Sequence, residues 1–511
     1  MHTLQIPSIH SSPQRFSGDR FLLELPFTPQ RFYRHGWQSW TFSGWIDPQL
    51  PALPVRAVQF RVKDEDPPYA LSDRHTSAWL AAVQIAPEEL VLVGGLDFGA
   101  RLQLEPNGLL AFYETGEGEW LLIRGTEPEV FHQYTQALCQ KYSCSLTRKT
   151  RRVWCSWYSL YRFINEEILR RILSDLGNLP FDVVQIDDGW QISTGDWQPN
   201  YKFPGGMADL AARIQASGRQ AGLWLSPFIV TADSTIFKQH PDWLLHNEQE
   251  MPVFAGRNWS GMTYALDATH PAVLDWLEQT IRRVTEWGFA YLKLDFLYAA
   301  ALPGRRTQEM PREAAYRQAL QVIRQAAPQA YLLACGAPLL PSLGLCDGIR
   351  IGPDVTPYWL NKPFSAWLNN PNHPSTQNAL RTCLHRLWLK PLIDIDPDVV
   401  YFRSRYNALT VEQRRLMKDL ALICGFRSTS DLPHWLSAQE REELQEFLEQ
   451  EVTIETLGNY RYRLNGREVD FGAAIPFPPT SNLPVWLATN LGFLQTGIYE
   501  VLPAVWEFYR W

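Results

Sequence analysis

The chain has 511 residues, of which 45% are hydrophobic and 20% are charged, and its formal net charge is −7. At about 100 to 200 residues per domain this length predicts two to four domains, and the composition excludes a chain that is disordered throughout. Because Lys and Arg are spread through a net acidic chain, we expect no nucleic-acid partner. Aromatic residues reach 13%, including 21 Trp, and such rings suit flat hydroxylated ligands as well as protein cores.

The first residues and the cysteines bear on location and redox chemistry. Residues 1–10 contain no basic start followed by an apolar stretch, and no apolar run approaches the ~18 residues that span a bilayer. We therefore expect a cytoplasmic protein without a membrane partner. The seven cysteines are odd in number and form no CxxC pair, so we expect neither a disulfide framework nor a Cys-type zinc site.

Residues 1–145 predict an N-terminal domain that is an antiparallel β-sandwich. Short apolar stretches, such as residues 57–62, 90–96 and 120–123, are separated by Pro, Gly, Asp and Asn. This spacing is typical of paired antiparallel sheets.

Residues 146–435 predict a central (β/α)8 TIM barrel. Eight short apolar runs that favour strands lie at residues 153–157, 183–187, 222–226, 291–295, 331–335, 348–351, 391–394 and near 425–428. Helix-length amphipathic segments alternate with them, at residues 165–176, 271–287 and 411–424. The connection over residues 227–289 is longer than one helix needs, and we expect it to build part of a binding site.

Residues 436–511 predict a small C-terminal β-sheet domain. A charged helix over residues 438–451 is followed by a stretch, residues 452–511, whose pattern favours short strands. The dipeptide Asn465-Gly466 is a strong hairpin signal within it. The sequence shows no internal repeat.

Polar residues end several of the predicted barrel strands, where barrel enzymes carry their function. Asp187 and Asp188 follow the second strand, Lys293 and Asp295 end the fourth, and Arg350 and Asp354 lie at the sixth. These residues should converge on one rim of the barrel.

The alternation of a strand places Lys293 and Asp295 on the same side. A lysine beside a carboxylate lowers the pKa of the carboxylate, so we expect Asp295 to be ionised. The alternative for this pair is a buried salt bridge that only closes the barrel end. For Asp187 and Asp188 the alternative is a helix cap or a solvated turn.

A metal site is disfavoured because Lys293 and Arg350 would repel a cation. The sequence also has no HExxH motif and no glycine-rich phosphate loop. Two carboxylates accompanied by cationic donors and many Trp match the requirements of glycosidic bond cleavage.

These motifs resemble glycoside hydrolase family 36, which contains α-galactosidases and shares a clan with family 27. The resemblance is carried by WCSWY at 154–158, QIDDGW at 185–190, GLW at 222–224, HPDW at 240–243, KLD at 293–295 and RIGPD at 350–354. These matches cover about residues 151–433, and HGWQSW at 35–40 is the best match in the N-terminal part.

The resemblance implies a role for each matching residue. Asp295 would be the nucleophile of a retaining mechanism and Asp354 the acid/base. Asp187 and Asp188 would bind the axial 4-hydroxyl and the 6-hydroxyl of galactose. The remaining candidates are Lys293 near the 3- and 4-hydroxyls, Arg350 with Cys335 opposite near the 2-hydroxyl, Trp157, Tyr158, Trp190 and Trp224 along the pocket wall, and Trp37 reaching over the pocket.

The expected activity is therefore a retaining α-galactosidase that acts on galactose-containing oligosaccharides or glycosides without a cofactor or metal. The sequence departs from the family pattern at residues 335–338 and 225–227, which leaves an α-N-acetylgalactosaminidase or a galactosyl transferase of the raffinose-synthase kind as alternatives. A non-catalytic sugar-binding protein is disfavoured because it needs no acid pair. For Trp37 and Trp40 the alternative is a place in an interface core, and for Cys335 it is that of a small buried hydrophobe. A homo-oligomer stays open.

Overall fold

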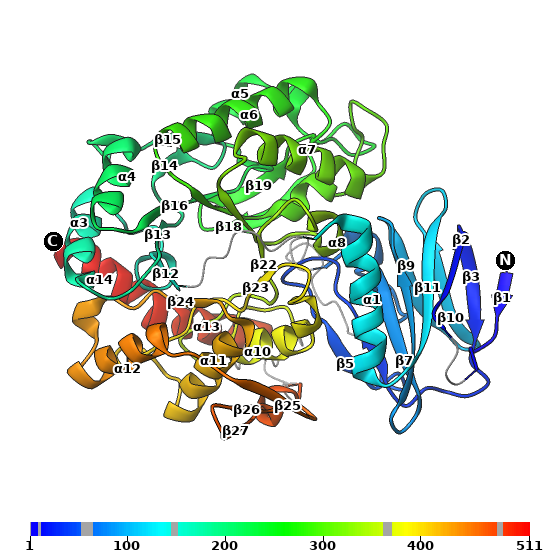
Figure 1. Ribbon diagram of the computed structural model, residues 1–511. Coiled ribbons are helices and arrows are strands. Elements are labelled where there is room, and N and C mark those ends of the chain that lie inside the picture. The colour runs from blue at the N-terminus through cyan, green and yellow to red at the C-terminus, as the bar shows by residue number, and fades with distance from the viewer. Residues whose placement is uncertain are drawn as a thin grey trace.

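The computed structural model describes residues 2–8, 12–52, 65–144, 152–360, 370–477 and 484–510. Figure 1 shows the N-terminal sheets at one end of the molecule and the central parallel strands at the other, with the end of the chain beside the latter. The predicted strand at residues 57–62 lies outside the described residues.

The N-terminal part contains two sheets, with the strand orders β1-β3-β10-β9-β6 and β2-β11-β8-β7-β4-β5. The strands are β1 His2–Leu4, β2 Gln14–Gly18, β3 Arg20–Glu24, β4 Phe32–Arg34, β5 Gly44–Ile46, β6 Thr76–Ala78, β7 Leu80–Ala86, β8 Glu89–Gly95, β9 Ala100–Glu105, β10 Gly108–Tyr113 and β11 Gly118–Gly125. All these pairs are antiparallel except β1 with β3, which is parallel. The predicted antiparallel sheets are thus confirmed, with buried side chains such as Leu23, Val93 and Trp120 in their core.

Helix α1 (Glu127–Tyr142) covers one of these sheets, as Figure 1 shows. Thr126 and Glu129 form a capping box at its start, which satisfies N–H groups that the first turn leaves free. Its buried residues include Val130 and Leu138, which pack on the six-stranded sheet.

The central part contains eight parallel strands in the order β23-β22-β21-β20-β16-β13-β12-β24. They are β12 Arg152–Cys155, β13 Val183–Ile186, β16 Gln220–Leu225, β20 Tyr291–Leu294, β21 Tyr331–Ala334, β22 Gly348–Arg350, β23 Asp394–Asp396 and β24 Arg427–Thr429. The eighth strand in the chain pairs with the first, and the N–H of Val400 donates to the carbonyl of Ser428 (2.8 Å) beside the remaining seam. This parallel order is consistent with the predicted barrel, although the seventh strand lies three residues later than expected.

Helices alternate with these strands. They are α2 Trp157–Leu160, α3 Glu166–Leu176, α4 Gly206–Ala216, α5 Thr235–Gln239, α6 Pro271–Glu286, α7 Arg312–Ala326, α8 Leu339–Ser342, α10 Thr376–Leu384 and α11 Val411–Cys424. Asn165 caps α3 by accepting from the N–H of Ile168, and Gly425 ends α11 in the left-handed region with φ 81°. The three helices predicted in this part are therefore confirmed. Asn165 and Gly425 are residue types that favour helix ends, so these boundaries could be predicted from the sequence.

Smaller elements decorate the connections. The strands are β14 Gln191–Ser193, β15 Asp196–Pro199, β17 Ile229–Thr231, β18 Phe254–Asn258 and β19 Gly261–Ala265. The short 3-10 turns are η2 Pro67–Tyr69, η3 Pro241–Trp243, η4 Leu297–Ala301, η5 Leu387–Leu389, η6 Pro433–Trp435 and η7 Gly472–Ala474. The long connection over residues 227–289 thus carries a three-stranded sheet, β17-β19-β18, before α6 begins.

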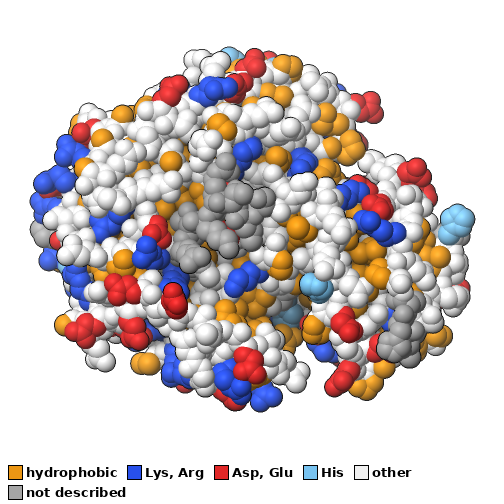
Figure 2. Space-filling view, viewed as in Figure 1, with side chains coloured by type: hydrophobic (Ala, Val, Ile, Leu, Met, Phe, Trp, Pro, Cys, Tyr) orange, Lys and Arg blue, Asp and Glu red, His pale blue; other side chains and the backbone are white. Residues whose placement is uncertain are grey.

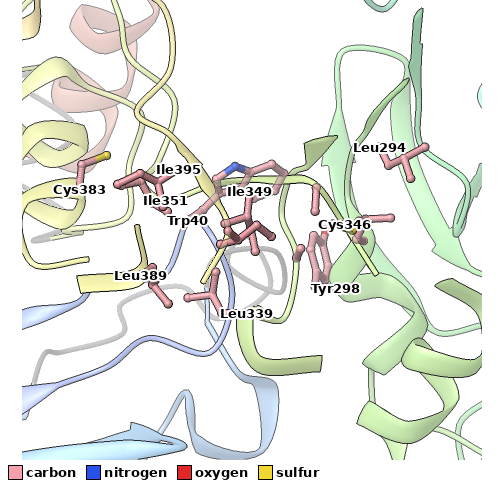
Figure 3. Close-up of a cluster of buried hydrophobic side chains, with 14 of the residues drawn as sticks. Trp40, Leu294, Tyr298, Leu339, Cys346, Ile349, Ile351, Cys383, Leu389 and Ile395 are labelled. Atoms are coloured by element: carbon pink, nitrogen blue, oxygen red, sulfur yellow. The ribbon is translucent and has the colours of Figure 1, made fainter. Parts of the chain in front are cut away.

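The loop at residues 35–43 joins the N-terminal sheets to the barrel. The buried Arg386 guanidinium donates to the carbonyls of Gly36, Gln38, Ser39 and Thr41. Figure 3 shows Trp40 of this loop among barrel side chains that include Ile349 and Ile351. The loop is therefore fixed to the barrel by hydrogen bonds and by apolar packing.

The C-terminal segment corrects the prediction. Helix α12 (Ala438–Glu449) is confirmed, and β25 Ile454–Gly458, β26 Arg461–Leu464 and β27 Arg467–Asp470 form an antiparallel sheet. The predicted hairpin is also confirmed, with positive φ at Asn465 and Gly466. Beyond it the prediction of strands is wrong, because α13 Val485–Thr496, the π-helical η8 Gly497–Val501 and α14 Leu502–Arg510 are helical.

On the face shown in Figure 2, Lys and Arg side chains are interspersed with Asp and Glu rather than gathered in one basic patch. Among the described residues, no helix combines the length and the apolar character that crossing a membrane requires.

Candidate active site

Asp187 and Lys293 form a buried ion pair at the ends of β13 and β20, the two strands that flank β16. The Nζ of Lys293 lies 2.9 Å from Oδ2 of Asp187, and the amide of Gln185 donates to the same oxygen (2.6 Å). The pKa of Lys293 is raised above its ordinary value although burial lowers it, because Asp187 and Asp295 favour the charged form. The structure thus brings the predicted lysine into contact with Asp187, and its positive charge is held in the site.

Asp188 lies beside this pair with a separate set of contacts. Its Oδ1 accepts from Nε2 of Gln191 (2.6 Å) and lies 3.7 Å from Nε of Arg162. Burial raises the pKa of Asp188 to about 6, although the Arg162 charge opposes the shift. A buried carboxyl group with few partners has lone pairs to offer to a ligand.

Asp295 follows β20 and is held at both oxygens. The indole N–H of Trp224 donates to Oδ2 (3.0 Å), and the backbone N–H of Phe296 donates to Oδ1 (2.9 Å). The expectation of a lowered pKa is wrong: burial raises the pKa of Asp295 above its ordinary value, and the Lys293 charge lowers it by less. Desolvation of a carboxylate at the bottom of a site outweighs one neighbouring cation here.

Arg350 connects Asp354 to two aspartates that the sequence analysis missed. Its guanidinium lies 2.9 Å from Asp396, 2.9 Å from Asp398 and 3.1 Å from Asp354. Asp396 ends β23 and Asp398 follows it, in the run Asp394-Ile395-Asp396-Pro397-Asp398. The predicted seventh strand ends at Asp394, whereas β23 ends at Asp396, so a search at the predicted strand end does not reach Asp396 or Asp398.

Asp354 and Asp398 differ in exposure. The side chain of Asp354 is 38% exposed, whereas that of Asp398 is fully buried. Burial raises the pKa of Asp398 to about 7, against the Arg350 charge that lowers it. Asp354 is thus the carboxyl group of this cluster that a substrate can reach from solvent.

Two of the predicted aromatic residues contact aspartates of the site. Tyr158 donates its hydroxyl hydrogen to Asp398, and Trp224 contacts Asp295 as described above. Trp157 is half-buried and packs edge-on against Tyr161 and Trp259, with ring centroids 5.1 and 5.7 Å away.

Trp190 does not line a pocket in this structure. Its ring is 0% exposed and packs against Trp197 and Trp287, while its N–H donates to the carbonyl of Trp224 (3.0 Å). The prediction for this residue is wrong because its indole fills the core behind β16. Cys335 is buried too, and its thiol lies within electrostatic range of Arg350 and Asp295; burial raises its pKa.

The prediction that Trp37 reaches over the pocket is also wrong. Its N–H donates to Oε1 of the buried Glu313 on α7 (2.9 Å), and the Arg312 guanidinium lies over its ring at 4.8 Å. The ring near the site is Trp40, which packs edge-on against Phe296, the residue after Asp295, at 5.3 Å. Trp37 therefore lies in the interface core, which was the alternative for this residue. The indole that lies near the site belongs to Trp40, three residues later in the loop.

Among the described residues, no group of three or more His, Cys, Asp or Glu side chains is arranged as a metal site. The chemistry available is that of carboxyl groups: a buried Asp295, a more exposed Asp354 and a buried Lys293–Asp187 pair that joins the ends of β20 and β13 across β16. Asp354 lies within electrostatic range of Asp295 and contributes to its raised pKa.

Several known proteins are similar to this chain in sequence. The Melibiase family model matches residues 127–327. Alpha-galactosidase AgaA of Geobacillus stearothermophilus is 33% identical over 184 residues, and Alpha-galactosidase 1 of Pediococcus pentosaceus is 26% identical over 239 residues. These alignments cover 33% and 41% of this chain, and only 24% and 32% of the relatives, so the chain matches at most about a third of their length.

A solved structure matches nearly the whole chain. The alpha-galactosidase TtGalA from Thermus thermophilus, in complex with p-nitrophenyl alpha-D-galactopyranoside, is 45% identical with a TM-score of 0.86. The match covers 90% of this chain and 94% of that one. The same enzyme in complex with stachyose is matched with 46% identity and a TM-score of 0.81, over 86% of this chain and 94% of that one.

Proposed function

The chain belongs to glycoside hydrolase family 36, and we propose that it is a retaining α-galactosidase that hydrolyses terminal α-linked galactose from oligosaccharides or glycosides. The observation that carries this proposal is the pairing of the held carboxylate Asp295 with the more exposed Asp354 in a site that also holds the Lys293–Asp187 pair.

In the first step, Asp295 attacks the anomeric carbon while protonated Asp354 donates to the glycosidic oxygen. The bond to the leaving group breaks as the bond to the Asp295 carboxylate forms, giving a β-linked galactosyl ester. The hydrogen bonds from Trp224 and Phe296 fix the orientation of the Asp295 carboxylate before the attack.

In the second step, Asp354 acts as a base. It takes a proton from water, the water oxygen attacks the anomeric carbon, and the ester to Asp295 breaks to release galactose with its α configuration retained. Arg350 lies 3.1 Å from Asp354 and carries the positive charge that balances Asp396 and Asp398. These steps use no cofactor.

The buried polar groups beside Asp295 would bind the galactose hydroxyls. We assign the axial 4-hydroxyl and the 6-hydroxyl to Asp187 and Asp188, and the 3- and 4-hydroxyls to Lys293. Arg350, with Cys335 opposite, lies on the side of the 2-hydroxyl. Charged hydrogen bonds of this kind discriminate strongly between epimers, because the wrong sugar leaves a buried charge without a partner.

The layout that we propose has a β-sandwich over residues 1–145, a closed (β/α)8 barrel over residues 146–435 and a C-terminal unit over residues 436–511. The parallel order with β24 beside β12 supports the barrel. The loop fixed by Arg386 supports a sandwich that serves the barrel as a structural partner.

Hydrolysis of a panel of chromogenic α- and β-glycosides tests the function. We expect turnover of the α-galactoside at least about a hundredfold faster than of the β-galactoside and the α-glucoside. Preference for the α-N-acetylgalactosaminide would show that the substrate sugar is N-acetylgalactosamine and not galactose. Formation of new oligosaccharides in dilute donor, without release of free galactose, would show that the reaction is galactosyl transfer and not hydrolysis.

A further inference from the structure

The turn at residues 258–261, between β18 and β19, carries an aromatic ring that faces solvent. Trp259 is 43% exposed, and its ring lies 5.0 Å from that of the buried Tyr161 and 5.7 Å from that of Trp157. Arg162 donates to the carbonyl of Trp259 (3.2 Å) and also lies 3.7 Å from Asp188. Arg162 therefore links the backbone of Trp259 to Asp188.

A carboxylate from the end of the chain lies on the other side of Tyr161. The hydroxyl of Tyr161 donates to Oε2 of Glu500 (2.8 Å), and the hydroxyl of Tyr358 donates to Oε1 (2.7 Å). Each carboxylate oxygen of Glu500 accepts one of these hydrogen bonds, so each has a second lone pair for a further donor.

Tyr358 follows Asp354 by four residues, and the charge of Asp354 is felt at Glu500. Glu500 is therefore within electrostatic range of Asp354, the residue that we assign to protonation of the departing oxygen. Residues far apart in the chain, in β18–β19, after α2 and in η8, meet there.

The segment that carries Glu500 is anchored at several points along the barrel. Gln495 donates to the carbonyl of Leu360 (3.2 Å), and Glu507 accepts from the indole of Trp435 (2.8 Å). Figure 1 shows α13 and α14, in red, beside the barrel and away from the N-terminal sheets. Glu500 is therefore held in position by the fold.

We propose that Trp259 and Glu500 form the binding site for the leaving-group sugar of an oligosaccharide substrate. The exposed face of the indole offers a surface for the C–H face of a sugar ring, and the carboxylate accepts hydrogen bonds from its hydroxyls. This inference rests on the proposed function, since it takes Asp354 as the group that protonates the leaving sugar.

The test compares a substrate with a leaving sugar to one without. The variants are Trp259→Ala and Glu500→Gln, with Glu507→Gln as the matched control on the same helical segment. Each is assayed by kcat/KM on the galactosyl trisaccharide raffinose and on α-galactosyl fluoride, whose leaving group is a single atom. Circular dichroism and Tm report the folded state of each protein.

For Trp259→Ala and Glu500→Gln we expect kcat/KM on raffinose to fall at least about tenfold more than kcat/KM on the fluoride. Glu507→Gln should lower both equally or neither. Equal losses on both substrates for the two site variants would overturn the inference. Failure of the wild-type protein to turn over α-galactosyl fluoride would instead count against the proposed function.

Discussion

The ammonium group of Lys293 lies 2.9 Å from the carboxylate of Asp187, and the two side chains are almost wholly enclosed. Two opposite charges in such a place depend on each other, because each would otherwise be a desolvated charge without a partner. The same pair stands next to Asp295, so it links the stability of the fold to the chemistry of the site.

Replacing Lys293 by Met should destabilise the protein by about 3 to 5 kcal/mol, because Asp187 loses its counter-charge while it stays buried. Adding Asp187→Asn in the same protein should restore much of the lost Tm, since both charges are then gone. The double variant should stay inactive if the pair binds sugar. Recovery of both stability and activity would show that the pair only closes the end of the barrel.

Asp188→Ala should lower kcat/KM for an α-galactoside roughly 10- to 150-fold, which corresponds to the loss of a charged hydrogen bond of about 1.5 to 3 kcal/mol. The loss of kcat/KM should be smaller on a substrate that lacks the hydroxyl group from which Asp188 accepts a hydrogen bond. The 4-deoxy and 6-deoxy galactosides are therefore assayed beside the unmodified galactoside. Near wild-type kcat/KM with all three substrates would leave Asp188 as a residue of the turn alone.

The buried Asp398 should make stability depend on pH. Its pKa is about 7 in the folded protein against an ordinary value of 3.8, so between these pH values the folded state keeps a proton that the unfolded chain has released. The stabilisation from that proton is complete below pH 3.8 and is lost as the pH rises through 7, at about 1.4 kcal/mol for each unit of pKa difference.

Asp398→Asn removes this titration. The Tm of the variant minus the Tm of the wild type should therefore rise from pH 4 to pH 7.5, whatever its value at pH 4. A difference that stays constant over this range would show that the proton on Asp398 is not linked to folding.

Substitutions of Trp37 and Trp40 should affect stability and activity differently. Trp37→Phe removes one of the two donors to Oε1 of the buried Glu313 and leaves Arg101 as the other. The loss of a hydrogen bond to a charged group costs about 1.5 to 3 kcal/mol, so we expect a lower Tm with kcat/KM within about threefold of wild type. Trp40→Phe changes the packing against Phe296, next to Asp295, and should lower kcat with a smaller change in Tm. The reverse pattern would show that Trp37 is the ring that serves the site.

The elements that could be predicted from the sequence are those with local signals. Residues 411–424 form the predicted helix because Thr410 caps its start and Gly425 ends it, and the strand ends at Asp187 and Asp295 follow from short apolar runs closed by acids. Local chemistry of this kind acts within a few residues and is visible in the sequence.

The errors concern residues whose state depends on distant partners. Which indole of the 35–43 loop faces the site depends on Glu313, 276 residues from Trp37. Residues 485–510 are rich in Val, Ile, Tyr and Trp, which favour strands, yet they form helices anchored by Glu500 and Glu507. The raised pKa of Asp295 reflects burial, which only the folded barrel provides.

The assignment of Asp295 as nucleophile is tested most directly by the product that azide forms with the Asp295→Ala variant. Without the carboxylate, a nitrophenyl α-galactoside should not turn over, and azide should enter the vacated space on the face opposite the leaving group. We expect restored release of nitrophenol and β-galactosyl azide as the product, identified by the anomeric coupling in its NMR spectrum. Formation of α-galactosyl azide would contradict it and would make Asp295 the acid/base.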